Sequence, residues 1–204
     1  MTPHLGWNGT GETRINGIPV QQNEVAAPLW EVFFRTALKR YRVVEIGTGT
    51  GGFTRHLARF ASHIITFDTV DRWYRRDVLD NTPDPSLCPI SRQIEDVFAV
   101  EKGIAASIKG TDPLVQPYAN LPVILICDGG NKPREVQTFA RYLKSGDVLA
   151  VHDYASLTMD KQFWGWCECT YTDLRGANTP YLRKKDLPFD KAAWGVWELT
   201  TTPV

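Results

Sequence analysis

A glycine-rich turn between a strand-like and a helix-like segment is the feature that most constrains the fold. The stretch YRVVEIGTGTGGFTRHLARF (41–60) places the β-branched run 42–46 directly before Gly47, Gly49, Gly51 and Gly52. Short β-branched runs are typical of buried parallel strands, and glycine allows the backbone conformations of a tight turn. This pattern predicts a parallel α/β sheet whose turn receives a small molecule.

Other segments continue the strand–helix alternation. Further strands are predicted at 63–68, 88–94, 123–127 and 146–153, and helices at 23–40, 52–60, 70–80, 95–109 and 133–144. Asn23 is the predicted N-cap of the first helix, and Pro133 is expected in the first turn of the last one. Two long strands are predicted at 162–174 and 192–201, with the basic stretch 181–189 as a loop between them. The fold class is therefore α/β: a three-layer sandwich with a Rossmann-like, mostly parallel seven-stranded sheet that ends in an antiparallel pair.

The length and charge of the chain limit the functions that fit it. A chain of 204 residues is suited to one domain, expected at 23–204, with 1–22 as an N-terminal extension. Lysine plus arginine and aspartate plus glutamate both total 23, so nucleic acid is not the expected partner. No apolar run is long enough to cross a membrane, and the N-terminus lacks the pattern of a secretion signal. The expected location is the cytoplasm.

The four cysteines do not form a convincing metal pattern. Cys167 and Cys169 form a C-x-C pair, but no second pair with metal-ligand spacing accompanies it. Reduced thiols that pack in the protein are favoured over a zinc site. The tryptophans of the closing strands are expected mainly in the sheet core, with an acceptor pocket as the alternative: Trp164, Trp166, Trp194 and Trp197.

The residues around the turn distinguish between two nucleoside ligands. Gly47, Gly49 and Gly52 satisfy G-x-G-x-x-G, so a dinucleotide is one candidate. Glu45, however, precedes the first glycine by two residues, giving the E-x-G-x-G-x-G pattern of S-adenosylmethionine (SAM) sites. Asp68 ends the next predicted strand and can accept both ribose hydroxyls of either ligand. A single domain also favours SAM, because dehydrogenases usually carry a second domain.

These residues resemble motif I of the class I SAM-dependent methyltransferases. The stretches INGIPVQQNEVAAPLWEVF and EIGTGTGGFT are similar to the small-molecule O-methyltransferases grouped with cephalosporin hydroxylase, which act on sugars and other natural products. The resemblance runs from about Thr13 to the C-terminus. It implies SAM as the cofactor and the following cofactor-binding residues: Glu45, Gly47, Thr48, Gly49, Gly51, Phe53, Asp68, Glu95 and Asp128. Of these, Glu95 is expected near the adenine.

Three further residues lie at predicted strand ends, where ligands of such sheets gather. Asp128 follows the fourth strand, and His152 and Asp153 follow the fifth. Metal-dependent members of the resembled group carry an acid and an acidic pair at these places, so His152 is a departure. The three residues predict either a divalent ion, with the imidazole shifting preference from Mg²⁺ toward Mn²⁺, or no metal at all.

Methyl transfer to oxygen requires alignment of the acceptor and removal of its proton. Asp128, His152 and Lys132 are the catalytic candidates. A metal held by Asp128 could acidify an acceptor hydroxyl, and His152 or Lys132 could instead be the base. The expected activity is therefore O-methylation of a small molecule or a saccharide.

The sequence disfavours one other class of methyltransferase and leaves further alternatives open. Asp128-Gly129-Gly130-Asn131 lacks the [DN]-P-P-[YFW] pattern of enzymes that methylate amino groups of bases. An RNA 2′-O-methyltransferase and a catalytically silent nucleoside-binding accessory protein are the rivals. A homo-oligomer is also left open.

Overall fold

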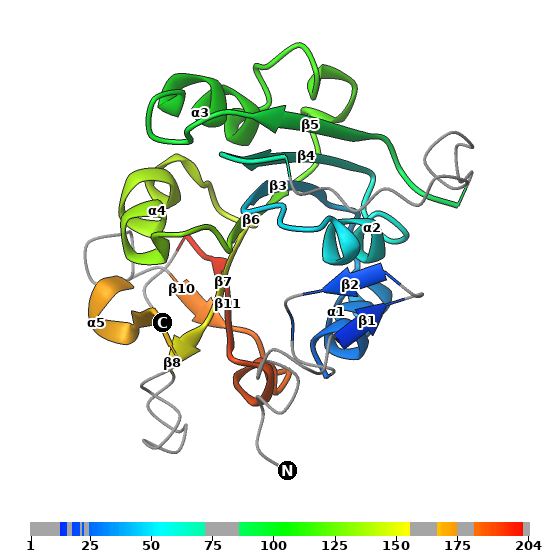
Figure 1. Ribbon diagram of the computed structural model, residues 1–204, viewed down its shortest axis with the longest axis vertical. Coiled ribbons are helices and arrows are strands. Elements are labelled where there is room, and N and C mark those ends of the chain that lie inside the picture. Colours follow the sequence, from blue (N-terminus) through cyan, green and yellow to red (C-terminus); the bar gives the residue numbers. More distant parts are fainter. Residues whose placement is uncertain are drawn as a thin grey trace.

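The computed structural model describes residues 13–15, 18–20, 22, 25–71, 86–155, 167–174 and 182–201. Its centre is a seven-stranded sheet in the order β10-β11-β7-β6-β3-β4-β5, with helices on both faces (Figure 1). The expected three-layer α/β sandwich is confirmed.

Five neighbouring strands form the parallel part of the sheet. They are β3 (Arg42–Ile46), β4 (His63–Asp68), β5 (Ile90–Ile94), β6 (Val123–Cys127) and β7 (Val148–His152). All of them except the edge strand β5 are buried along their whole length. Burial on both faces explains the continuous apolar runs from which these strands were predicted.

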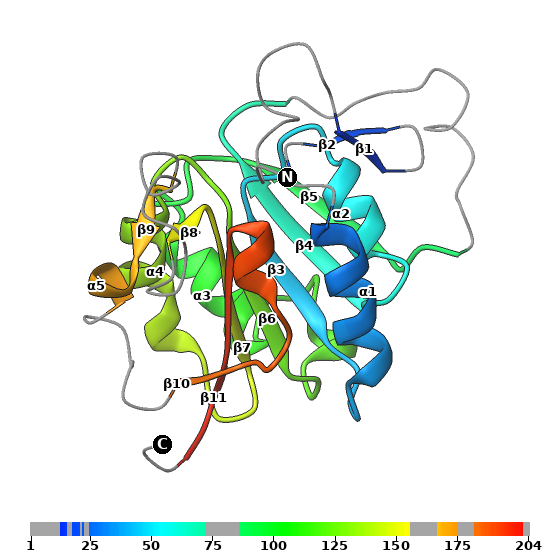
Figure 2. The same cartoon turned by 90° about the horizontal axis from the view of Figure 1, so that it is seen from below.

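Helices cover the two faces in pairs: α1 (Ala26–Thr36) with α2 (Gly52–Leu57), and α3 (Glu101–Lys109) with α4 (Lys132–Phe139). Figure 2 shows the two pairs on opposite sides of the sheet. Val43 belongs to the hydrophobic cluster under α1 and α2, whereas its neighbour Val44 belongs to the cluster under α3 and α4. Side chains alternate along a strand, so one buried strand supplies both cores.

The sheet ends in an antiparallel strand pair as predicted, but one strand of the pair comes from a different segment. β11 (Trp194–Leu199) runs antiparallel to β7 on one side and to β10 (Leu182–Lys184) on the other. The predicted loop 181–189 therefore contains a strand. Trp194 and Trp197 are buried in the sheet core as expected, whereas Trp164 and Trp166 lie outside the described residues.

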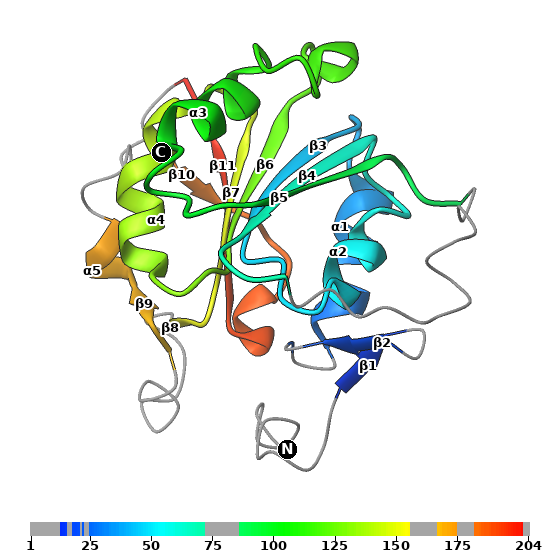
Figure 3. The same ribbon diagram turned by 45° about the horizontal axis from the view of Figure 1, so that its top comes forward.

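The prediction of a long strand at 162–174 is wrong over the described residues 167–174. Only β9 (Cys169–Thr170) is extended there, and it pairs in parallel with β8 (Tyr154–Ala155) outside the main sheet. The carboxylate of Asp173 accepts hydrogen bonds from the backbone N–H and the hydroxyl of Thr170, which starts the short helix α5 (Tyr171–Leu174). α5 and β9 lie beside α4 (Figure 3).

Several helices are also shorter in the structure than the sequence predicts. α1 begins at Ala26 with Val25 at its N-cap, and the expected cap Asn23 lies outside the described residues. α3 begins at Glu101, because the carboxylate of Asp96 accepts from the Phe98 N–H and holds a turn there. Most of the helix predicted at 70–80 lies outside the described residues.

Short elements complete the fold: the 3-10 helices η1 (Gln116–Tyr118), η2 (Ala140–Tyr142) and η5 (Phe189–Ala192), and the hairpin of β1 (Thr13–Ile15) and β2 (Ile18–Val20). The hairpin contacts α2 and so lies near the glycine turn (Figure 2). None of the helices within the described ranges is long and apolar enough to cross a bilayer.

Candidate functional site

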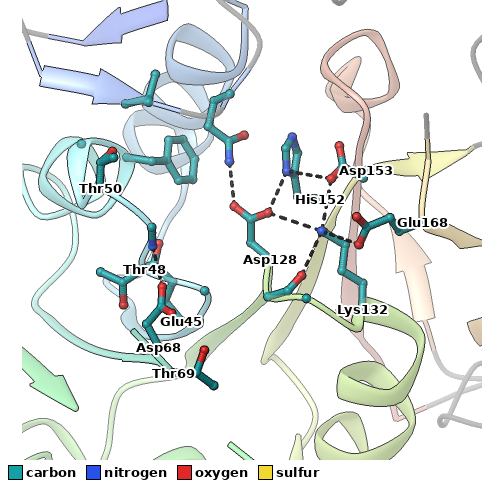
Figure 4. Close-up of a pocket in the computed structure, with 18 residues that line it drawn as sticks. Glu45, Thr48, Thr50, Asp68, Thr69, Asp128, Lys132, His152, Asp153 and Glu168 are labelled. Atoms are coloured by element: carbon teal, nitrogen blue, oxygen red, sulfur yellow. Dashed lines mark hydrogen bonds and ion pairs between the residues drawn. The ribbon is translucent and has the colours of Figure 1, made fainter. Parts of the chain in front are cut away.

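A cavity of about 320 Å³ opens at the carboxyl ends of β3, β4, β6 and β7 (Figure 4). Such strand ends are where ligands of open α/β sheets bind. The lining combines the glycine turn with the side chains that follow the strands: Val20, Gln22, Glu45, Gly47, Thr48, Gly49, Thr50, Gly52, Phe53, Asp68, Thr69, Asp128, Gly129, Gly130, Lys132, His152, Asp153 and Glu168.

The glycine turn between β3 and α2 has a backbone that only glycine adopts easily. Gly47, Gly49 and Gly51 have φ values of 90°, 53° and 78°, in the left-handed region. At Gly47 a Cβ would also lie 2.2 Å from the Asp128 carbonyl oxygen. In the structure, the obstacle to a side chain at Gly47 is therefore the backbone after β6.

Asp68, at the end of β4, is joined to the turn through its carboxylate. Its Oδ2 accepts from the Gly49 N–H at 2.9 Å, and its Oδ1 accepts from the Val70 N–H at 3.1 Å. A carboxylate offers about four acceptor positions, so about two remain for hydroxyl groups of a ligand. The Asp68 carboxylate is therefore held in place by the backbone and can still accept further hydrogen bonds.

Glu45 lies at the base of the cavity, on β3. Its Oε2 accepts from Thr66 at 2.6 Å and from Thr54 at 2.7 Å. Burial raises the pKa of Glu45 to about 7, although both threonine hydroxyls favour the carboxylate. A cation bound nearby would shift this carboxyl toward its ionised form.

Asp128 and His152 form a pair across the ends of β6 and β7. His152 Nδ1 lies 2.7 Å from Asp128 Oδ1, and the Gln22 amide donates to Asp128 Oδ2 at 2.7 Å. Trp194 packs against the imidazole at 4.9 Å between ring centroids and donates to Gln22 at 3.0 Å. Burial alone would lower the pKa of His152, but the neighbouring carboxylates, chiefly Asp128, outweigh it and raise the pKa.

Lys132 lies between three carboxylates at the start of α4. Its Nζ is 2.8 Å from Glu168 Oε2, 3.1 Å from Asp153 Oδ2 and 4.0 Å from Asp128 Oδ1. Burial would lower the pKa of Lys132, but these charges raise it above its ordinary value. An ammonium held in this way is a poor proton acceptor, so the structure favours His152 over Lys132 as a base.

The loop after Asp128 is fixed from inside the protein by Glu135. Its carboxylate accepts from the Gly129 N–H at 3.2 Å and from the Asn131 N–H at 3.1 Å. Glu135 is buried, which raises its pKa to about 7. Asn131 caps α4 through the Arg134 N–H, so the loop presents Asp128 and Lys132 in one arrangement.

The structure brings together most of the residues predicted from the sequence. Those that line the cavity are Glu45, Gly47, Thr48, Gly49, Phe53, Asp68, Asp128, Lys132, His152 and Asp153. Gly51 is in the turn, as the N-cap of α2, and Glu95 follows β5 with its N–H bonded to the Asp68 carbonyl; neither lines the cavity.

Four polar side chains of the cavity are not among the predicted site residues: Gln22, Thr50, Thr69 and Glu168. Of these, Gln22 and Glu168 bond to other residues of the cavity. The sequence pattern assigns Gln22 to the extension 1–22 and Glu168 to a closing strand. Both reach the cavity through contacts with residues far away in the sequence, Asp128 and Lys132 respectively. Gln22 lies within the stretch 15–33 that resembles O-methyltransferases, but the resemblance assigns it no role, and no motif marks Glu168.

The three residues predicted as metal ligands do lie together. One ligand atom each from Asp128, His152 and Asp153 falls within 4.8 Å of the others. His152 Nδ1, however, faces the Asp128 carboxylate at hydrogen-bonding distance, and the Lys132 ammonium lies beside the Asp153 carboxylate. As arranged, these residues hold their own cation and do not fit a divalent ion.

Comparisons with known proteins identify the fold. No protein-family model matches the sequence, and no curated protein is similar to it in sequence. A methyltransferase-like protein from Silicibacter pomeroyi is 12% identical with a TM-score of 0.55, over 92% of this chain and 91% of that one. A protein classed as an O-methyltransferase from Klebsiella pneumoniae is 14% identical with a TM-score of 0.55, over 91% and 84%.

A sugar N-methyltransferase from Streptoalloteichus is 12% identical with a TM-score of 0.50, over 87% of each chain. At such identities the likeness establishes the fold. The chain therefore has the fold of the class I methyltransferases, as its glycine turn indicated.

Proposed function

We propose that the chain is a SAM-dependent O-methyltransferase that acts on a hydroxyl of a small molecule or a saccharide. The observation that carries this proposal is the Asp128–His152 pair, which faces the same cavity as the glycine turn and Asp68. A site for the methyl donor and a base for the acceptor thus share one space.

The charge of the cavity suits the methyl donor. Five carboxyl groups line the cavity, against Lys132 and His152: Glu45, Asp68, Asp128, Asp153 and Glu168. SAM carries a sulfonium and an ammonium against a single carboxylate, so it is a net cation. Asp68 would accept from the ribose hydroxyls, and Glu45 lies where it can favour the positive end of the molecule. We call Glu45, the turn 47–52 and Asp68 the donor side.

The acceptor side consists of Asp128, Lys132, His152, Asp153 and Glu168. The Asp128 carboxylate can only accept a hydrogen bond, so in the neutral imidazole of His152 the proton is on Nδ1 and Nε2 has the free lone pair. In the proposed reaction the acceptor oxygen attacks the methyl carbon as the carbon–sulfur bond breaks. The hydroxyl proton passes to His152 Nε2, and S-adenosylhomocysteine leaves.

Labelled SAM tested against catechols, sugars and nucleic acids would examine this function. We expect transfer to a hydroxyl of a small molecule or sugar. His152→Gln should lower kcat by about 100-fold or more while leaving SAM affinity unchanged. His63→Gln is a matched control, because His63 is also buried but bonds Ser91 and stacks on Tyr118 away from the cavity.

Other results would support the alternatives. Transfer to RNA alone would favour a 2′-O-methyltransferase, although the equal numbers of basic and acidic residues disfavour broad binding to RNA. SAM binding without transfer to any acceptor, and equal behaviour of both histidine variants, would indicate an accessory protein. In calorimetry, a binding heat on titration with NADH and no binding heat on titration with SAM would indicate a dehydrogenase.

A further inference from the structure

We infer that Lys132 is a built-in replacement for the divalent cation, so that the acceptor side works without a metal. This inference rests on the proposed function and concerns how the same site is charged. It resolves the choice that the sequence left open between an ion held by Asp128, His152 and Asp153 and no ion.

The hydrogen bonds of Lys132 fix its ammonium at the centre of the acceptor side. An ammonium has three N–H donors. Here two of them have acceptors, the Gly129 carbonyl at 3.0 Å and Glu168 Oε2 at 2.8 Å, and Asp153 Oδ2 forms an ion pair with the ammonium at 3.1 Å. Only 5% of the Lys132 side chain is exposed. This lysine is therefore a buried cation paired with two carboxylates rather than a surface charge.

The same carboxylate oxygens are the ones that an ion would need. Asp153 Oδ2 contacts Lys132 at 3.1 Å and lies 3.6 Å from His152 Nδ1, while Asp128 Oδ1 contacts that nitrogen at 2.7 Å (Figure 4). A metal ligand must offer a lone pair, yet Nδ1 uses its hydrogen toward Asp128. An entering ion would have to displace that proton and come close to an ammonium, which repels it.

The position of Lys132 is set by the backbone. It is the first residue of α4, followed by Pro133, and the preceding loop is fixed by Glu135. Lys132 in turn bonds Asp153, after β7, and Glu168, beside β9. It is thus a positioning residue that joins three separate segments and supplies the positive charge that balances their carboxylates.

Titration with Mn²⁺ alone, followed by electron paramagnetic resonance, tests the inference without any acceptor or methyl transfer. We expect the wild type to bind Mn²⁺ no more tightly than the millimolar range. Lys132→Ala should bind it about tenfold or more tightly, because the repelling charge is gone and the carboxylates remain. Lys132→Arg should behave like the wild type.

Two controls locate the effect. Lys102→Ala removes an exposed lysine of α3 and should leave Mn²⁺ binding unchanged. Adding Asp153→Asn to Lys132→Ala should abolish the increase in Mn²⁺ affinity. Stoichiometric, micromolar Mn²⁺ binding by the wild type that Asp153→Asn removes would overturn the inference, and so would equal weak binding by the wild type and a folded Lys132→Ala.

The wild-type titration decides the question even if Lys132→Ala does not fold. Calorimetric titration with SAM reports on the proposed function separately. Normal SAM binding with tight Mn²⁺ binding would refute only the role of Lys132, whereas weak Mn²⁺ binding with no SAM binding would refute only the proposed function. In an active wild type, we further expect EDTA to leave the rate of methyl transfer unchanged.

Discussion

The donor side and the acceptor side share one cavity but are built in different ways. The donor side comes from one stretch, residues 45–68, and depends on the backbone: three glycines with positive φ and N–H groups bonded to Asp68. The acceptor side joins side chains from three separate segments: Asp128 with Lys132, His152 with Asp153, and Glu168. Backbone shape therefore defines one half and charge pairing the other.

The two sides are in contact at Gly47, so a substitution there should have the largest effect, which we expect on the stability of the fold. Gly47→Ala introduces a Cβ that would lie 2.2 Å from the Asp128 carbonyl oxygen, in a residue with φ of 90°. We expect the free energy of unfolding to fall by about 3 kcal/mol, as measured by urea denaturation.

Gly130→Ala is the matched control for Gly47→Ala. Gly130 also lines the cavity, but an added Cβ meets nothing within 4 Å. The free energy of unfolding should change by no more than about 0.5 kcal/mol. Equal stability of the two variants would show that the two sides are not pressed together at this point.

The next largest effect is expected on the donor side alone. Asp68→Asn keeps the shape of the side chain but removes acceptor capacity for ribose hydroxyls. SAM affinity should weaken about 10- to 100-fold in calorimetry. The exposed Asp186, away from the cavity, provides the control variant Asp186→Asn. Unchanged SAM affinity in Asp68→Asn would remove Asp68 from the donor side.

A smaller effect concerns the pH dependence of SAM binding. Glu45 has a pKa raised to about 7, so below that pH the free protein holds a proton there. A bound cation favours the carboxylate and expels this proton, so SAM affinity should rise as pH increases from about 6 to about 7.5. Proton release is measured by calorimetry in buffers of different ionisation enthalpy.

Two variants separate Glu45 from Glu135, the other carboxyl group whose pKa is raised to about 7. Glu45→Gln should lose the proton release. Glu135→Gln should retain it, because Glu135 has the same raised pKa of about 7 but does not line the cavity. Proton release that survives Glu45→Gln would assign the titration to another group.

The smallest effect should come from the link between the N-terminal hairpin and the acceptor side. Gln22→Ala removes the bond to Asp128 Oδ2 and the acceptor of the Trp194 indole. We expect kcat to fall about fivefold, with SAM affinity unchanged. Gln116→Ala, which loses only a bond to the Gly110 carbonyl, should have no effect on kcat. Loss of SAM affinity in Gln22→Ala would place this residue on the donor side.

The difference between the two sides also explains what the sequence could predict. The parallel strands and the donor side follow from local patterns, since the apolar runs and the glycine turn each lie within a few residues. Asp128, His152 and Asp153 were found because strand ends meet at one edge of the sheet. The pairing of β10 with β11, and the approach of Gln22 and Glu168, depend on contacts between distant segments, which no local pattern records.

The electrostatic state of the acceptor side was the least predictable part. In sequence, Lys132 resembles any solvated lysine at a helix start. Only the fold shows that its ammonium is buried among Asp128, Asp153 and Glu168. The steric role of Gly47 was likewise hidden, because its obstacle is the backbone of a strand far away in the sequence.

A crystal structure with bound S-adenosylhomocysteine tests the central claim most directly. The account predicts the ribose hydroxyls within hydrogen-bonding distance of Asp68, the methionine part over the turn 47–52, and the sulfur facing the Asp128–His152 pair. A ligand bound elsewhere, or a cavity that stays empty at saturating ligand, would contradict it.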